Sequence, residues 1–177
     1  LDAGTWDKGV DAIVTAADDS DVDGEQPSRL ITGSVLNGDA AYAGMDPSDV
    51  FIRVKDDDAA GVWLSHSTLN VSEPEGTVAF FVRLTARPSA DVTVELRRSN
   101  LELTVYPAIL TFTPDNYDID QTVAITAEDD GEVDGTQISN INARANSEDP
   151  LYLIPDAGSV EVAVADNASG MLLERVY

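Results

Sequence analysis

The chain has 177 residues, of which 43% are hydrophobic, and 33 acidic against 10 basic residues give it a formal charge of −23. That hydrophobic fraction suffices for a packed core, whereas so negative a chain repels nucleic acid and anionic membranes unless a cation intervenes. The absence of cysteine excludes disulfides and thiolate metal sites, and no stretch approaches the roughly 20 apolar residues of a membrane span.

An internal repeat organises the chain. An alternating run at 12–16 precedes an acidic turn at 17–24, and the same succession recurs 111 residues later; after a slip of one residue, the offset is 110. We therefore expect a tandem repeat with a partial first unit. Residues 1–58 would be the second half of a unit, 59–61 a short linker, 62–168 a complete unit, and 169–177 a tail or the first strand of a following unit. The matched pairs include Asp18/Asp129, Asp23/Asp134, Gly24/Gly135, Gln26/Gln137, Asp39/Asp149, Tyr42/Tyr152, Val50/Val160, Ile52/Val162 and Val54/Val164.

Alternating polar and apolar residues predict β-strands with one buried face in the complete unit. We expect about seven short strands and no amphipathic helix, which is typical of an all-β, immunoglobulin-like antiparallel β-sandwich. Asp, Gly, Pro and Asn occupy the intervening turns. The clearest alternating runs are 77–84, 91–96, 109–112, 121–127, 136–144 and 158–165.

The partial first unit lacks counterparts of residues 62–112. The three strands expected in it, one of them at 12–16, would leave half a core exposed and strand edges unpaired. Two explanations stay open: the chain is a piece of a longer array, or another copy adds the missing strands by strand donation. The tail 171–177 is apolar enough to be such a donor.

The acidic residues gather at turns and strand ends, whereas adaptation to saline surroundings, the alternative explanation of the charge, would scatter them. Clustering favours a metal, and calcium takes 6–8 hard oxygen ligands, more than one turn supplies. In a sandwich, three segments near 72–76, after 127 and near 166 can converge at one pole. The candidate ligands in the complete unit are Glu73 or Glu75, Asp129, Asp130, Glu132, Asp134 and Asp166, and in the first unit Asp18, Asp19, Asp21, Asp23, Asp56, Asp57 and Asp58.

Several segments together resemble the Calx-β domain family, over 62–168 fully and over 5–58 as half a domain. The resemblance implies an immunoglobulin-like sandwich that binds calcium at one pole. The segments that carry it are Val71-Ser72-Glu73, the runs 78–84, 110–113 and 121–127, Asp129-Asp130, and 160–167.

The resemblance also implies roles for individual acids. The family's acid in the early strand falls on Glu73, its paired aspartates on Asp129 and Asp130, and its following and terminal acids on Asp134 and Asp166. Two departures remove negative charge: Gln137 and Gln26 stand where the family has Glu, and the terminal acidic run is reduced to Asp166-Asn167. A single ion or a weaker site is therefore expected in the complete unit, and the run 56–58 is the stronger candidate.

No catalytic constellation is evident. The only histidine, His66, lies in a polar segment typical of a surface, and zinc spacing, phosphate-binding glycine loops and EF-hand loops are absent. We therefore expect a non-enzymatic, calcium-binding structural or adhesion repeat of a secreted or cell-surface protein. Its partners would be neighbouring repeats, other copies, or a surface glycan or protein ligand. The alternatives are a metal-independent subunit of a surface filament or layer, assembled by strand complementation, and a glycan-binding accessory domain of a secreted enzyme.

Overall fold

The computed structural model describes residues 8–36, 39–73 and 76–166. The chain divides into two compact units, Leu1–Asp57 (unit 1) and Asp58–Tyr177 (unit 2). The tail expected at 169–177 lies outside the described residues. No helix within the described ranges is long and apolar enough to cross a membrane.

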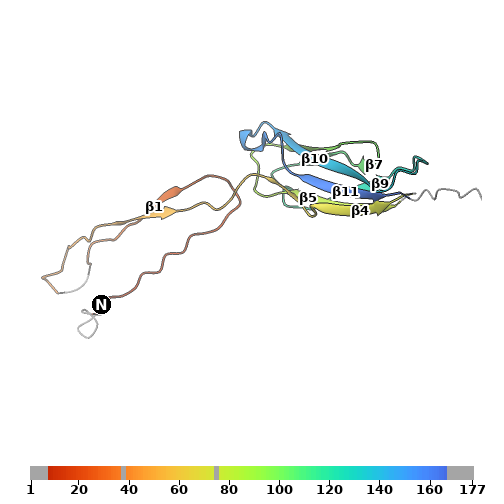
Figure 1. The fold of residues 1–177 in the computed structure, drawn as a ribbon. Helices are drawn as coiled ribbons and strands as arrows, with labels where there is room; N and C mark the ends of the chain where they lie inside the picture. The colour runs from red at the N-terminus through yellow and green to blue at the C-terminus, as the bar shows by residue number, and fades with distance from the viewer. Residues whose placement is uncertain (1–7, 37–38, 74–75, 167–177) are drawn as a thin grey trace, which may run out of the picture. The chain divides into compact units, whose positions relative to one another are not determined.

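Unit 2 is an immunoglobulin-like β-sandwich, as the sequence predicts (Figure 1). Its neighbouring strands are antiparallel except β4 and β11, which pair in parallel. This parallel pair differs from the antiparallel sandwich that the sequence predicts. Its two strands are far apart in the sequence, because most of unit 2 lies between them along the chain. One sheet has the order β4 (Thr68–Ser72), β11 (Ser159–Ala165), β10 (Gln137–Ser147), β6 (Val92–Arg98) and β8 (Ile109–Phe112). The other has the order β3 (Val62–Leu64), β5 (Thr77–Leu84), β9 (Gln121–Ala127) and β7 (Leu103–Tyr106).

The described part of unit 2 thus has nine strands where about seven are expected. The two additional strands, β3 and β7, contain only 3 and 4 residues. Neither lies in one of the clearest alternating runs of the sequence, whereas β8, which also has 4 residues, does.

The core of unit 2 lies between the two sheets, where the apolar positions of each alternating run meet. In β5, for example, Phe80, Val82 and Leu84 are at most 1% exposed, while Phe81 between them is 41% exposed. The other large buried side chains come from both sheets and include Val92, Val94, Leu103, Phe112, Val123, Ile125, Ile141 and Val160.

A buried tyrosine closes one end of this core. The short 3-10 helix η1 (Pro150–Tyr152) follows β10, and Asp149 caps it by accepting a hydrogen bond from the Leu151 amide at 2.9 Å. The Tyr152 hydroxyl donates to the Ala86 carbonyl at 2.5 Å and accepts from the Ala86 amide at 3.3 Å. Asp149 Oδ2 also accepts from the Ser89 amide at 2.8 Å. These bonds join η1 to the connection between β5 and β6.

Unit 1 contains one β-hairpin, β1 (Gln26–Leu30) with β2 (Val50–Val54), in its described residues. The pairs Gln26↔Val54 and Leu30↔Val50 have the same register as Gln137↔Val164 and Ile141↔Val160 in β10 and β11. The hairpin is therefore the structural counterpart of β10–β11.

The prediction of a third strand in unit 1, at 12–16, is wrong, because these residues form no strand. The matching strand of unit 2, β9, lies between β5 and β7. The described residues of unit 1 contain no counterpart of either neighbour, and an extended run without a hydrogen-bonding partner does not form a strand.

Candidate functional site

Three segments of unit 2 meet at one pole of the sandwich through backbone hydrogen bonds. The Glu73 amide, just after β4, donates to the Ala165 carbonyl at the end of β11, at 3.0 Å. The Ala127 amide, at the end of β9, donates to the Gly76 carbonyl, also at 3.0 Å. The segments that the sequence predicts at one pole therefore lie together.

A close approach of Gly76 to the backbone of Ser72 holds Glu73 in this position. The Gly76 amide donates to the Ser72 carbonyl at 3.0 Å. A Cβ atom added to Gly76 would lie 2.2 Å from that same carbonyl oxygen, which is far inside van der Waals contact. Only glycine fits here, and Gly76 is a positioning residue that no pattern in the sequence indicates.

Glu73 is a carboxylate with only 8% of its surface exposed. Its burial raises its pKa above the ordinary value, and the negative charges of Asp130, Asp166, Asp129 and Asp134 raise the pKa further. All the charged neighbours that shift it are carboxylates, so five of the predicted ligands interact electrostatically at this pole. Glu132 is not among them, and Glu75 lies outside the described residues.

Hydrogen bonds fold the acidic loop that follows β9 back toward the end of β11. Asp130 Oδ1 accepts from the Glu132 amide at 2.8 Å, and Asp166 Oδ2 accepts from the Gly135 amide at 3.2 Å. The Gln137 side chain donates to the Asp134 carbonyl at 3.3 Å. The glutamine that departs from the Calx-β pattern thus contacts the loop through its amide group.

Unit 1 repeats each of these bonds at the matched positions. Asp19 Oδ1 accepts from the Asp21 amide at 3.0 Å, and Asp56 Oδ2 accepts from the Gly24 amide at 2.7 Å. The Gln26 side chain donates to the Asp23 carbonyl at 2.9 Å. Gly24 and Gly135 share a positive φ, 74° and 78°. The internal repeat of the sequence is therefore also a repeat of local structure.

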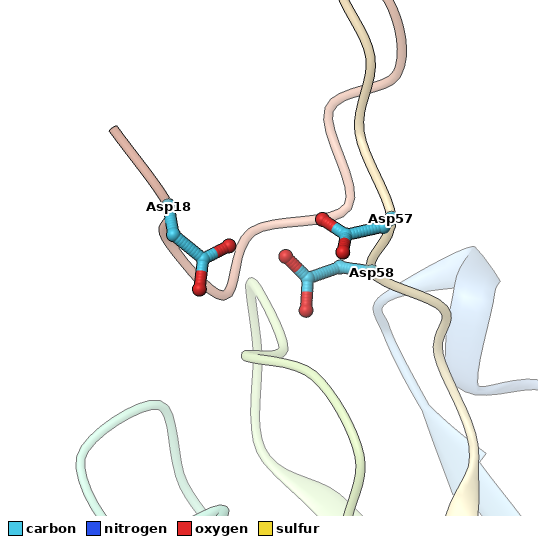
Figure 2. Close-up of side chains that lie close together, drawn as sticks. All are labelled: Asp18, Asp57 and Asp58. Atoms are coloured by element: carbon cyan, nitrogen blue, oxygen red, sulfur yellow. The ribbon is translucent and has the colours of Figure 1, made fainter. Parts of the chain in front are cut away.

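Figure 2 shows the carboxylates of Asp18, Asp57 and Asp58, one oxygen of each lying within 4.8 Å of the others. Asp57 is the last residue of unit 1, and Asp58 follows it directly in the chain. In the described residues this is the only group of three or more potential metal-ligating side chains that is so close. The side chains of Asp21 and Asp23 are exposed.

The only histidine occupies an exposed position at the start of unit 2. His66 Nδ1 lies 2.8 Å from the Ser65 hydroxyl, which also accepts a hydrogen bond from the Phe81 amide at 2.8 Å. This arrangement ties the residues between β3 and β4 to β5.

No family model matches the chain, and no curated protein matches it. Among solved structures, it is similar to the periplasmic chaperone SfaE, with 12% identity and a TM-score of 0.48 over 65% of this chain and 61% of the chaperone. It is also similar to the apo form of the Calx CBD1 domain, with 16% identity and a TM-score of 0.48 over 62% of this chain and 99% of that domain. PapD-like domain 7 of human CEP192 matches with 11% identity and a TM-score of 0.43, over 71% and 99% of the two chains. Identities this low concern the fold alone.

Proposed function

We propose that this chain is a calcium-binding structural or adhesion repeat of a secreted or cell-surface protein, without enzymatic activity. The observation that carries the proposal is the position of Glu73, a buried carboxylate whose charged neighbours are four aspartates. The resemblance of the segments around these acids to the Calx-β family supports the same function.

The electrostatics of this pole favour a divalent cation. Burial without a compensating positive charge makes an ionised carboxylate costly, and like charges around it add to that cost. A cation reverses both effects by supplying positive charge and taking carboxylate oxygens as ligands. Calcium suits such a site because it accepts oxygen ligands in flexible geometry.

Glu73, Asp129, Asp130, Asp134 and Asp166 would hold the ion in unit 2. Asp18, Asp57 and Asp58 are a second set of candidate ligands, and one oxygen of each already lies within 4.8 Å of the others. An ion bound there would neutralise three adjacent carboxylates and stiffen the chain between neighbouring repeats.

Isothermal titration calorimetry of the chelator-treated chain tests this function. We expect heat of binding with calcium at or below millimolar concentration, and not with sodium at matched ionic strength. Binding to the folded state alone would add about 2.7 kcal/mol of stability at 100 times the dissociation constant. If calcium gives neither heat nor a higher melting temperature, or behaves as magnesium and sodium do, the proposal is wrong.

A second candidate function rests on a different observation. The apolar side chains of the hairpin in unit 1 are exposed, among them Val50 at 51% and Phe51 at 81%. A metal-independent subunit of a surface filament or layer, completed by strands from another copy, would cover such a hairpin. This function predicts particles that grow with protein concentration in the presence of a chelator.

A further inference from the structure

We propose that the inner face of unit 1 is the docking surface for the first half of a repeat of the same kind as residues 58–117, carried directly ahead of unit 1 in the same polypeptide. By the inner face we mean the side chains of Val14, Leu30, Tyr42 and Val50, whose matched positions in unit 2 belong to its core; Leu30 and Val50 are paired across the hairpin. The inference concerns the completion of unit 1 and holds with or without calcium.

The exposure of this face contrasts with the burial of its counterpart. None of the described residues of unit 1 is buried, although the matched positions of unit 2 belong to its core. Val14, Leu30, Tyr42 and Val50 are 55%, 36%, 57% and 51% exposed, whereas the matched Ile125, Ile141, Tyr152 and Val160 are each 0% exposed.

The shared register of the two hairpins shows which strands are missing. In unit 2, β10 pairs on its other edge with β6, and β11 pairs on its other edge with β4. The run 12–16 matches β9, whose two neighbours are β5 and β7. All four of these partner strands lie between Thr68 and Tyr106, so one contiguous segment would supply every missing neighbour.

The tyrosine corner, by which we mean the turn from Asp39 to Tyr42 and its counterpart from Asp149 to Tyr152, is formed in unit 1, but the described residues give the Tyr42 hydroxyl no acceptor. The Tyr42 amide donates to the Asp39 carbonyl at 2.9 Å, as the Tyr152 amide donates to the Asp149 carbonyl at 3.0 Å. Asp39 Oδ1 accepts from the Ala41 amide at 2.9 Å, the same distance as in the matched bond of Asp149.

In unit 2, the connection between β5 and β6 contacts the tyrosine and the aspartate of this corner. It provides the Ala86 backbone for the tyrosine hydroxyl and the Ser89 amide for Asp149. The docking segment must therefore present a backbone carbonyl to the hydroxyl of Tyr42 and an amide to the carboxylate of Asp39. A segment like 58–117 supplies both the carbonyl and the amide. A single donated strand would pair with only one of the unpaired strand edges of unit 1.

Two arguments place this segment in the same polypeptide. In a second copy of the chain, residues 58–117 already pack against that copy's own β9, β10 and β11. In unit 2 the first half leads directly into the second, and a covalently joined partner acts at an effective concentration of about millimolar.

The test is an extended chain, with an added copy of residues 58–117 joined ahead of residues 7–177. We expect amide hydrogen exchange in β1 and β2 to slow at least tenfold relative to the original chain, with unit 2 as an internal reference. A second version joins residues 58–116 ahead of 6–177, so that one strained junction does not decide the result.

Two variants of the extended chain serve as controls. Phe80→Asp with Val82→Asp, made in the added copy only, should abolish the protection. Tyr42→Phe should speed exchange in the extended chain and leave the original unchanged. If neither junction protects β1 and β2, the proposal is wrong. The proposal would also be wrong if β1 and β2 were already protected from exchange in the original chain and that chain formed a dimer whose population rises with concentration. A second copy would then cover the inner face.

Discussion

The backbone amide of Gly24 donates a hydrogen bond to Oδ2 of Asp56 at 2.7 Å, across 32 residues of the chain. Unit 2 makes the matched bond from Gly135 to Asp166 at 3.2 Å, across 31 residues. In both units an aspartate at the end of the last strand thus anchors the acidic loop. The loop carboxylates are positioned by the fold itself, which lowers the ordering cost of binding a cation.

Replacing the buried carboxylate at the pole of unit 2 should have opposite effects with and without calcium. Glu73→Gln removes a buried negative charge that four aspartates oppose, so the chelated protein should melt at a higher temperature than the unsubstituted chain at neutral pH. The same change removes a proposed ligand and should reduce the rise in melting temperature on adding calcium. Differential scanning calorimetry measures both effects.

Glu161→Gln is the matched control, because it removes the same charge from an exposed position on β11. It should leave the calcium response intact. A Glu73→Gln protein that responds to calcium as the unsubstituted chain does would remove Glu73 from the site.

The pH dependence of stability follows from the raised pKa of Glu73. A carboxyl group whose pKa is higher in the folded than in the unfolded state stabilises the fold below the unfolded pKa, and this contribution is lost as the pH rises through the folded value. Without calcium, Glu73→Gln should therefore gain stability over the unsubstituted chain as the pH rises from 4 to 7 (about the ordinary carboxyl pKa to neutral). Urea midpoints of the two proteins along this series check it, and a constant difference would contradict it.

The close approach of Gly76 to Ser72 should not tolerate a side chain at Gly76. Gly76→Ala places a Cβ atom 2.2 Å from the Ser72 carbonyl oxygen, and relieving the clash should cost about 1–3 kcal/mol. Urea unfolding measures the loss, and calcium affinity should fall with it. Gly33→Ala is the control, because a Cβ there meets nothing within 4 Å. Equal stability of the two variants would show that this close approach is not constrained.

The two tyrosines of the repeat should respond differently to loss of the hydroxyl. Tyr152→Phe leaves the buried Ala86 carbonyl without its donor and should destabilise unit 2 by about 1–3 kcal/mol. Tyr42→Phe, at the matched but exposed position, should change the stability of the present chain by less than about 0.5 kcal/mol. Urea unfolding of the two variants, measured side by side, gives the comparison. Equal losses of stability would contradict the difference between the buried and the exposed tyrosine.

Much of unit 2 could be predicted from its sequence because its strands alternate clearly, as at Phe80, Val82 and Leu84. The run at 12–16 matches β9 in the repeat but forms no strand, since strand formation depends on neighbours that a local pattern does not include. The hydrogen-bond partner of the Tyr152 hydroxyl could not be predicted from the sequence either. It is the backbone of Ala86, and any residue type other than proline at position 86 would offer the same groups. The clustering of acids at turns did indicate a pole, but not that Gly76 holds Glu73 there.

The central claim, a cation site at the pole of unit 2, is tested most directly by backbone NMR of the chelated chain titrated with calcium. The account predicts chemical-shift changes concentrated at Glu73, at residues 128–136 and at Ala165 and Asp166, and weaker changes with magnesium at equal concentration. Changes scattered over the acidic surface, or the same changes on adding sodium chloride, would contradict it.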